Sequence, residues 1–299
     1  MKAVQYSEFG DPEVLHVAEV EEPHAGAGQI RVAVKGASVN PIDWKRRSGM
    51  MGGDLPTIPG SDVAGVVDEV GDGVTDVAVG DEVFGNAVGG GSAEHALMSQ
   101  YAIKPASLSW EEAAGLPVAV ETAVRTLDLL GVEPGQTVLV NGAAGGVGSA
   151  AVQFARARGA RVIGTASEGN HEFLRSLGAE PTVYGDGLVE RVRELAPDGV
   201  DRALDTAGKG ALPDLIELTG SPDNVVTIAD FAGAPEHGVR ITTGSDGRSW
   251  QALGEAARLY EEGKLSLPVE RTFPFSQAPE AHRISQEGHV RGKLVLIPD

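Results

Sequence analysis

Eight residues near the middle of the chain combine glycines with the start of a helix. Residues 141–148 read NGAAGGVG, and they lie between a short apolar run and a helical pattern. In a dinucleotide-binding loop, glycines permit a tight turn and let a pyrophosphate approach the first turn of the following helix. Backbone amides without partners and the helix dipole favour negative charge there. The predicted cofactor-binding residues of this loop are Ala143, Ala144, Gly145, Gly146, Val147 and Gly148.

The next predicted strand indicates which dinucleotide the loop binds. A strand that binds NAD usually ends in an acid, about 20 residues after the loop, which holds the ribose 2′-hydroxyl. Here the strand ends with Thr165, Ala166 and Ser167, so a small neutral residue stands where the acid is expected. This leaves room for a 2′-phosphate, to which Ser167 can donate, and it predicts NADP(H), with Thr165 and Ser167 among the cofactor-binding residues. Glu168, directly after them, is the main argument for NAD.

The composition argues against a metal site and against nucleic acid. The chain has no cysteine, and none of its 7 histidines stands three or four residues from another. We therefore predict no structural zinc, which cysteines usually hold, and no catalytic metal. The net charge of −19 disfavours nucleic acids and anionic membranes, because both require basic surfaces. No apolar run reaches the roughly 20 residues of a membrane helix, and no secretory signal is recognised, so we predict a cytoplasmic protein.

Two kinds of secondary structure must position these residues. Up to about residue 110 the pattern is mostly β, with period-two alternation over residues 30–37 and a further strand over 63–71. From there strands alternate with helices, which predicts a parallel sheet covered on both faces. We assign residues 113–248 to the nucleotide domain, and we assign residues 1–112 and 249–299 to a second, interrupted domain. The predicted fold class is α/β.

Several segments together resemble the quinone oxidoreductase branch of the medium-chain dehydrogenase/reductase superfamily. They are the glycine loop, the strand end Gly164-Thr165-Ala166-Ser167, the N-terminal segments 38–45 and 59–67, residues 173–179, and Gly292-Lys293-Leu294-Val295-Leu296. The similarity extends over essentially the whole chain. It implies a GroES-like, β-rich catalytic domain interrupted by a Rossmann domain, with the active site in the cleft between them.

The resemblance also implies that zinc is absent. Zinc-dependent relatives carry a cysteine where Asn40 stands and a histidine where Ser61 stands. Their third ligand falls near Val118 and Ala119, which cannot coordinate a metal. Without a Lewis acid, alcohol oxidation is disfavoured, whereas NADPH can still reduce a carbon that is already electrophilic.

By family position, the predicted catalytic residues lie in one N-terminal loop. Asn40 and Lys45 are candidate donors to the substrate oxygen, with Lys45 in the basic run 45–47 and so also readable as a solvated lysine. Asp43 is expected to orient its neighbours. Further cofactor contacts are expected at Thr122, Thr206, Ala207, Ile228 and Ala229. Asn170 stands where relatives often carry a lysine for the 2′-phosphate, to which its amide could donate.

The function predicted on this basis is NADPH-dependent reduction of an α,β-unsaturated carbonyl compound or a quinone. The departure from the usual loop tyrosine, at Trp44 and Lys45, favours enones and alkenals over simple quinones. The alternative hypothesis is a catalytically weak NADPH-binding redox sensor or interaction protein. A homodimer is expected, with the candidate contact surface at residues 225–228 and the loop after them.

Overall fold

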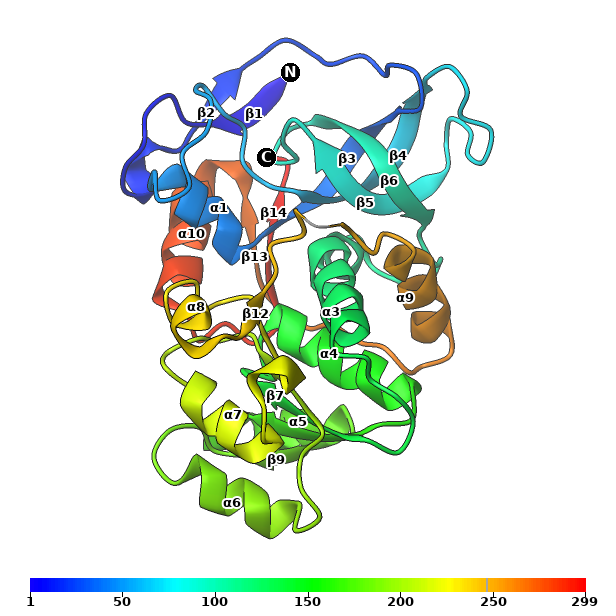
Figure 1. Cartoon of the computed structure of the whole chain (residues 1–299). Helices are drawn as coiled ribbons and strands as arrows, with labels where there is room; N and C mark the ends of the chain where they lie inside the picture. Colours follow the sequence, from blue (N-terminus) through cyan, green and yellow to red (C-terminus); the bar gives the residue numbers. More distant parts are fainter. Residues whose placement is uncertain (246) are drawn as a thin grey trace. The chain divides into compact units, whose positions relative to one another are not determined.

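The computed structural model describes residues 1–245 and 247–299, and the chain divides into two compact units. Unit 1 consists of residues Met1–Val118, Leu253–Glu262 and Leu267–Asp299, and unit 2 of Ala119–Ala252 and Gly263–Ser266. As the chain colours in Figure 1 show, both ends of the sequence, blue and red, belong to unit 1.

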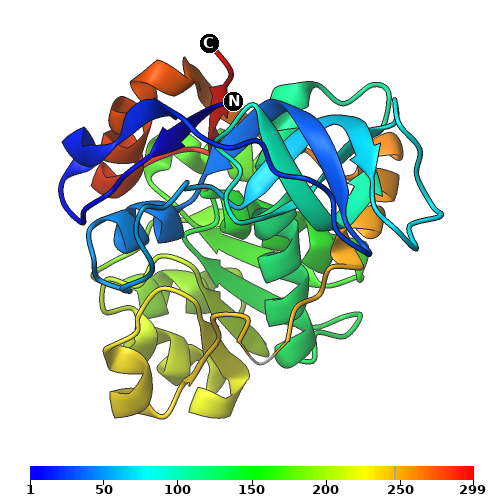
Figure 2. The ribbon, with the colours of Figure 1, turned by 90° about the horizontal axis from the view of Figure 1, so that it is seen from above.

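Unit 1 is built on β-strands. Its main sheet has the order β13-β14-β3-β4-β5-β6, and β3 also pairs with β6, so that β3 to β6 form a closed group (Figure 2, blue to blue-green). The strands of this sheet are β3 (Ile30–Val39), β4 (Asp62–Val70), β5 (Glu82–Val88), β6 (His95–Ile103), β13 (Val269–Pro274) and β14 (Lys293–Ile297). A separate antiparallel pair is formed by β1 (Lys2–Gln5) and β2 (His16–Glu19). Alternate residues of the first half of β3 are buried, as the period-two pattern predicted.

Short helices cover this β structure. They are η1 (Pro12–Val14), α1 (Pro41–Arg47), α2 (Trp110–Gly115), α9 (Ala252–Glu261), η4 (Phe275–Gln277) and α10 (Ala278–Glu287). Helix α2 begins at a capping box, in which the Ser109 side chain accepts from the Glu112 N–H and the Glu112 side chain accepts from the Ser109 N–H.

Unit 2 contains a parallel sheet with the order β12-β11-β10-β7-β8-β9. Numbered within this unit, the order is 3-2-1-4-5-6 read from β9, the arrangement of a Rossmann domain, and it reverses between β7 and β10. Its strands are β7 (Thr137–Asn141), β8 (Arg161–Thr165), β9 (Glu180–Thr182), β10 (Arg202–Asp205), β11 (Val225–Thr227) and β12 (Arg240–Ile241). The predicted α/β fold class, a GroES-like β-rich domain with a Rossmann domain, is confirmed.

Helix α3 (Pro117–Leu129) precedes the parallel sheet, and the other helices of this unit connect its strands (Figure 1, green to yellow). The connecting helices are α4 (Gly146–Ala157), η2 (Glu168–Asn170), α5 (His171–Ser176), α6 (Leu188–Leu195), α7 (Leu212–Thr219), η3 (Pro222–Asn224) and α8 (Gly233–His237). Apolar side chains of β7, β8, β10 and β11 pack with those of α6 and α7 in one core. In the described part of the chain, no helix is both long and apolar enough to cross a membrane.

One expected feature of this sheet is wrong. Residues 225–228, with the loop after them, were predicted as the contact surface of a dimer, but β11 lies between β10 and β12 and is fully buried, so this strand cannot pair edge to edge with a second subunit. The edge strand on this side of the sheet is β12, which has only two residues. So short a strand has no periodicity that a sequence pattern could reveal.

Candidate functional site

The glycine loop joins the end of β7 to the start of α4. Gly142 has φ +81°, a conformation that L side chains rarely adopt, and it starts the turn. Gly145 is the N-cap of α4, with φ −74° and ψ 172°. A Cβ at Gly148 would lie 2.3 Å from the Gly142 carbonyl oxygen, so only glycine lets the helix approach its own loop this closely. The first-turn amides of this 12-residue helix have no acceptor within the helix and can bind an anion.

A row of buried polar side chains runs across the carboxyl ends of four neighbouring strands. Thr165 ends β8 and donates to Asn141 Oδ1 (2.7 Å) at the end of β7. Asn141 Nδ2 donates to Asp205 Oδ1 (2.9 Å) at the end of β10, and Thr227 Oγ1 of β11 donates to Asp205 Oδ2 (2.7 Å). We call Thr165, Asn141, Asp205 and Thr227 the strand-end network. It crosses the β7–β10 boundary, where open α/β sheets bind ligands.

The strand-end network fixes the backbone of the loops around it. Thr165 Oγ1 accepts from the Gly142 N–H (3.0 Å), and the Thr165 carbonyl accepts from the Ala143 N–H. Asp205 Oδ1 accepts from the N–H groups of Ala207 (3.1 Å) and Gly208 (2.9 Å). The glycine loop and the loop after β10 are therefore held by the same connected side chains.

Most of the other predicted cofactor residues of unit 2 lie around this network. Thr206 Oγ1 donates to the Asn141 carbonyl (2.8 Å). The Ile228 N–H donates to the Asp205 carbonyl, and the Ala229 N–H donates to Thr227 Oγ1 (3.1 Å). Asn141, Asp205 and Thr227 were not predicted as site residues. The available signal was the small polar residue that ends each apolar strand.

The two residues predicted for the 2′-phosphate lie together after β8. Asn170 Nδ2 donates to Ser167 Oγ (3.2 Å), and Ser167 is exposed. Ala166, where an NAD-binding acid would stand, is buried and neutral. Glu168 begins η2 on the same exposed stretch.

Thr122 lies in a different environment of unit 2, on α3. Its hydroxyl donates to Glu121 Oε2 (3.3 Å) and accepts from Arg125 Nη2 (3.4 Å), both on its own helix. Glu121 is fully buried and also accepts from Arg248 Nη1 (3.0 Å) and the Ser249 N–H (3.0 Å). The structure therefore ties α3 to the segment before α9, and it places Thr122 within a charged network.

In unit 1, the three predicted catalytic residues lie on a helix, which corrects the expectation of a loop. Pro41 occupies the first turn of α1, Asn40 is its N-cap, and Asp43 Oδ2 accepts from the Asn40 N–H (2.8 Å). Asp43 Oδ1 also accepts from the Gly60 N–H (3.3 Å). Proline at the first helical position is compatible with helix formation because its missing N–H would have no helical partner there.

The Asn40 side chain belongs to a buried polar cluster. Asn40 Nδ2 donates to Asp62 Oδ2 (2.8 Å), and Asn40 Oδ1 accepts from Lys293 Nζ (2.5 Å). Asp62 also accepts from Ser38 Oγ (2.8 Å) and the Val118 N–H (2.8 Å), and its Oδ2 lies 3.3 Å from Lys293 Nζ. We call Ser38, Asn40, Asp62 and Lys293 the Asn40 cluster. Ser38, Asp62 and Lys293 lie in segments that carry the family resemblance, but they were not predicted as site residues.

The lysine that contacts Asn40 is thus Lys293, and the predicted Lys45 has a different environment. Lys45 is half-buried, its Nζ lies 5.7 Å from the centroid of the Trp44 ring, and burial lowers the pKa of its ammonium. A cation over an aromatic face gains a weak attraction.

The pKa of Asp43 is raised from its ordinary 3.8 to about 6, chiefly by burial and to a smaller extent by the nearby Asp62 carboxylate. The Asn40 N–H and the positive charges of Lys293 and Arg46 act in the opposite direction. The folded protein therefore holds the Asp43 proton more tightly than the unfolded chain does.

This shift predicts a dependence of stability on pH. The stabilising contribution of Asp43 is complete below its unfolded pKa of 3.8 and is lost as the pH rises through about 6. We expect the stability of the wild type relative to Asp43→Asn to fall by roughly 3 kcal/mol between about pH 4 and pH 7, at about 1.4 kcal/mol per pKa unit. Urea unfolding of both proteins across this range measures the difference. Parallel stability curves would contradict the raised pKa.

The residues do not fit a zinc site. At the three positions where zinc-dependent relatives carry ligands, this chain has Asn40, Ser61 and the Val118–Ala119 pair. Within residues 1–245 and 247–299, no three His, Cys, Asp or Glu side chains converge in a way that could hold a metal ion.

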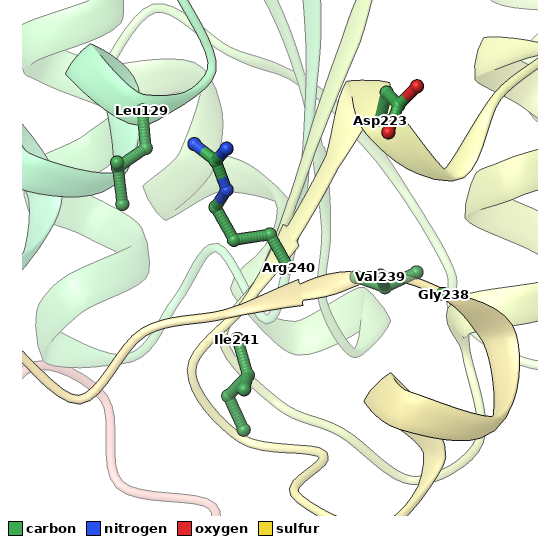
Figure 3. Close-up of a pocket in the computed structure, with 6 residues that line it drawn as sticks. All are labelled: Leu129, Asp223, Gly238, Val239, Arg240 and Ile241. Carbon is green, nitrogen blue, oxygen red and sulfur yellow. The ribbon is translucent and has the colours of Figure 1, made fainter.

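A shallow hollow of unit 2 lies apart from all the residues predicted for the site. Its volume is about 560 Å³, and it is lined by Leu129, Asp223, Gly238, Val239, Arg240 and Ile241. Figure 3 shows the Arg240 side chain extending from β12 toward Leu129, with Asp223 on the far side of the hollow. The hollow therefore lies beside the edge strand, and none of its lining residues belongs to the glycine loop or the strand-end network.

The similarity to known proteins identifies the family. Residues 26–176 match the alcohol dehydrogenase GroES-like domain, and residues 177–296 match the zinc-binding dehydrogenase family. The chain belongs to the medium-chain dehydrogenase/reductase superfamily, in agreement with the resemblance noted from its motifs.

Two curated relatives and two solved structures illustrate the relationship. The chain is 35% identical to a 2-methylene-furan-3-one reductase from Solanum lycopersicum, and the match covers 100% of this chain and 79% of the relative. It is 34% identical to a chloroplastic NADPH-dependent alkenal/one oxidoreductase from Arabidopsis thaliana, covering 100% and 80%. The quinone oxidoreductase structure from Coxiella burnetii is 33% identical, with a TM-score of 0.85 and coverage of 100% and 99%. The Escherichia coli quinone oxidoreductase, solved with NADPH, is 25% identical, with a TM-score of 0.83 and full coverage of both chains.

Proposed function

We propose that this protein is an NADPH-dependent reductase of α,β-unsaturated carbonyl compounds or quinones. The observation that carries the proposal is the glycine loop at the start of α4, held in place by the strand-end network. This loop occurs in a chain whose relatives include an NADPH-dependent alkenal/one oxidoreductase and quinone oxidoreductases.

The glycine loop of unit 2 fits a dinucleotide. A Cβ at Gly145 would meet only the Gly142 oxygen, at 3.6 Å, so the space in front of this residue is open. The residues from Ala143 to Gly148 would hold the pyrophosphate against the first turn of α4. Ser167 and Asn170 would donate to the 2′-phosphate, and Thr165 would support both regions because it fixes the Gly142 backbone. When bound, NADPH supplies the hydride for the reduction.

The remaining cofactor residues are proposed from their family positions. Thr206 and Ala207 would contact the adenosine side, and Ile228 and Ala229 the nicotinamide end. Thr122 would lie near the nicotinamide, with its hydroxyl orientation set by Glu121 and Arg125.

Asn40 is the proposed donor to the substrate oxygen. Hydride addition to the β-carbon of an enone, or to a quinone ring, places negative charge on that oxygen, and a pre-oriented N–H stabilises it. Asp43 would act on Asn40 through the Asn40 N–H, and Lys45 is retained as a second candidate donor. Solvent supplies the final proton.

Oxidation of NADPH, followed spectrophotometrically in EDTA, tests this proposal. We expect turnover with trans-2-hexenal or 1,4-benzoquinone, faster with NADPH than with NADH. We expect Asn40→Ala to lower kcat about 100-fold, as loss of one donor to an oxyanion does, and to leave NADPH affinity unchanged. Tight NADPH binding without reduction of any acceptor would instead favour the redox-sensor alternative. An unchanged kcat in Asn40→Ala would exclude Asn40 as the donor.

Three further properties belong to the same proposal. The enzyme is zinc-free, because the residues at the family's zinc positions cannot coordinate the metal. It forms a homodimer, for which the edge strand β12 is now the candidate contact. It is cytoplasmic, which the absence of cysteine favours because disulfides are common in exported proteins.

A further inference from the structure

Two opposite charges contact the two ends of the Asn40 carboxamide. The Asp62 carboxylate accepts from Nδ2 at 2.8 Å, and the Lys293 ammonium donates to Oδ1 at 2.5 Å. Asn40, Asp62 and Lys293 are 5%, 0% and 4% exposed, so water competes little for these contacts. Such hydrogen bonds to charged groups are stronger than those between neutral groups.

This arrangement permits only one orientation of the amide. A carboxylate can only accept and an ammonium can only donate, so rotating the carboxamide by 180° would place oxygen against oxygen and N–H against ammonium. An asparagine between two hydroxyl groups lacks this constraint, because each hydroxyl can donate or accept. The two charges therefore determine on which side of the Asn40 carboxamide the Nδ2 donor lies.

The two charged residues are themselves held in place. Asp62 accepts from Ser38 Oγ and the Val118 N–H, each at 2.8 Å, in addition to its contacts with Asn40 and Lys293. The Lys293 stem packs against Gly115, where an added Cβ would lie 3.2 Å from Lys293 Cγ. The packing around its stem therefore holds the Lys293 ammonium at Asn40.

We infer that Lys293 and Asp62 are positioning residues that orient the Asn40 carboxamide as a hydrogen-bond donor to the substrate. This inference rests on the proposed function of Asn40. One Nδ2 hydrogen is used by Asp62, and the oxygen is engaged by Lys293, so the second Nδ2 hydrogen is the group that Asn40 offers to an incoming oxygen. The reductase would therefore favour substrates that present an acceptor, such as a carbonyl or quinone oxygen.

A double-mutant cycle between Asn40→Ala and Lys293→Met tests this inference. Methionine keeps the length of the lysine stem and removes the ammonium. We expect Lys293→Met to lower kcat with trans-2-hexenal about 10- to 100-fold, with NADPH affinity unchanged. If Lys293 acts through Asn40, the double variant should be no slower than Asn40→Ala alone.

Lys104→Met is the matched control. Lys104 is also a buried lysine of unit 1, 7% exposed, and its Nζ lies 2.9 Å from Glu82 Oε2 rather than near Asn40. We expect this variant to lose stability without a comparable change in kcat. If Lys293→Met does not fold, Asp62→Asn combined with Lys293→Met removes both buried charges together and enters the same cycle.

The outcomes separate this inference from the proposed function. If Asn40→Ala lowers kcat and Lys293→Met does not, Asn40 remains the donor and the positioning role is overturned. If Lys293→Met lowers kcat by the same factor in the Asn40→Ala background as in the wild type, Lys293 acts independently of Asn40, and the positioning role is also overturned. If Asn40→Ala leaves kcat unchanged, Asn40 is not the donor to the substrate oxygen, and the positioning role of Lys293 and Asp62 is overturned as well.

Discussion

We expect Gly148→Ala to weaken NADPH binding roughly 100-fold or more, because strain of about 3 kcal/mol in the loop corresponds to two powers of ten in affinity. The added Cβ would lie 2.3 Å from the Gly142 oxygen and 2.8 Å from the Ala143 Cα. Both are backbone atoms of the glycine loop, so the methyl group fits only if the loop opens away from α4. Fluorescence titration with NADPH measures the loss.

A companion variant separates distortion of the loop from exclusion of the cofactor. At Gly145 the added Cβ would meet only the Gly142 oxygen, at 3.6 Å, and φ is −74°, which alanine adopts readily. We expect Gly145→Ala to melt like the wild type and still to bind NADPH at least about tenfold more weakly, because the methyl group occupies space that the pyrophosphate needs. Gly254→Ala on α9, where nothing lies within 4 Å, is the control and should not change NADPH affinity. Wild-type affinity in both loop variants would contradict the assignment of this loop to the cofactor.

The sequence predicted the glycine loop well because its signals are local. An apolar strand, a turn that needs glycine and a helix follow one another within residues 137–157, and the structure has β7 and α4 there. Helix α1 was missed although its signals are also local. Asn40, Pro41 and Asp43 stand at the N-cap, first and third helical positions, which is a typical helix start. A loop was predicted here instead because the resemblance to the family implied one.

The Asn40 cluster could not be predicted in the same way. Lys293 is 253 positions from Asn40 in the sequence, and the two meet because β14 pairs with β3, with Leu294 opposite Val39. No periodicity in either segment specifies this pairing. The basic run at Lys45 was therefore the more conspicuous indication of a lysine in the site, although the lysine that contacts Asn40 is Lys293, on the buried strand β14. The register between distant strands is the information that the sequence pattern lacked.

Substitution of Asp205, the central residue of the strand-end network, should strongly destabilise unit 2. Its carboxylate accepts from four donors: Asn141 Nδ2, Thr227 Oγ1 and the N–H groups of Ala207 and Gly208. Asp205→Ala leaves these donors without their acceptor, at about 1–3 kcal/mol for each buried one that stays unsatisfied; the Ala207 N–H, on an exposed residue, can turn to water. We expect a loss of roughly 3–5 kcal/mol in the stability of unit 2, which is a large part of the 5–15 kcal/mol typical of a folded protein.

Asp205→Asn should be nearly as damaging, although it preserves the shape of the side chain. An amide retains only one accepting oxygen. Either Thr227 Oγ1 or the donors that share Oδ1, which are Asn141 Nδ2 and the two loop N–H groups, therefore lose their partner. Asp201→Asn is the matched control. Asp201 is an exposed acid directly before the start of β10, the strand that Asp205 ends, and its Oδ2 accepts from one N–H, that of Thr137, at 2.7 Å. Urea midpoints and NADPH titrations should both separate the Asp205 variants from this control. Wild-type NADPH affinity in a folded Asp205→Asn protein would mean that the glycine loop keeps its conformation without the network and that cofactor binding does not depend on the strand-end side chains.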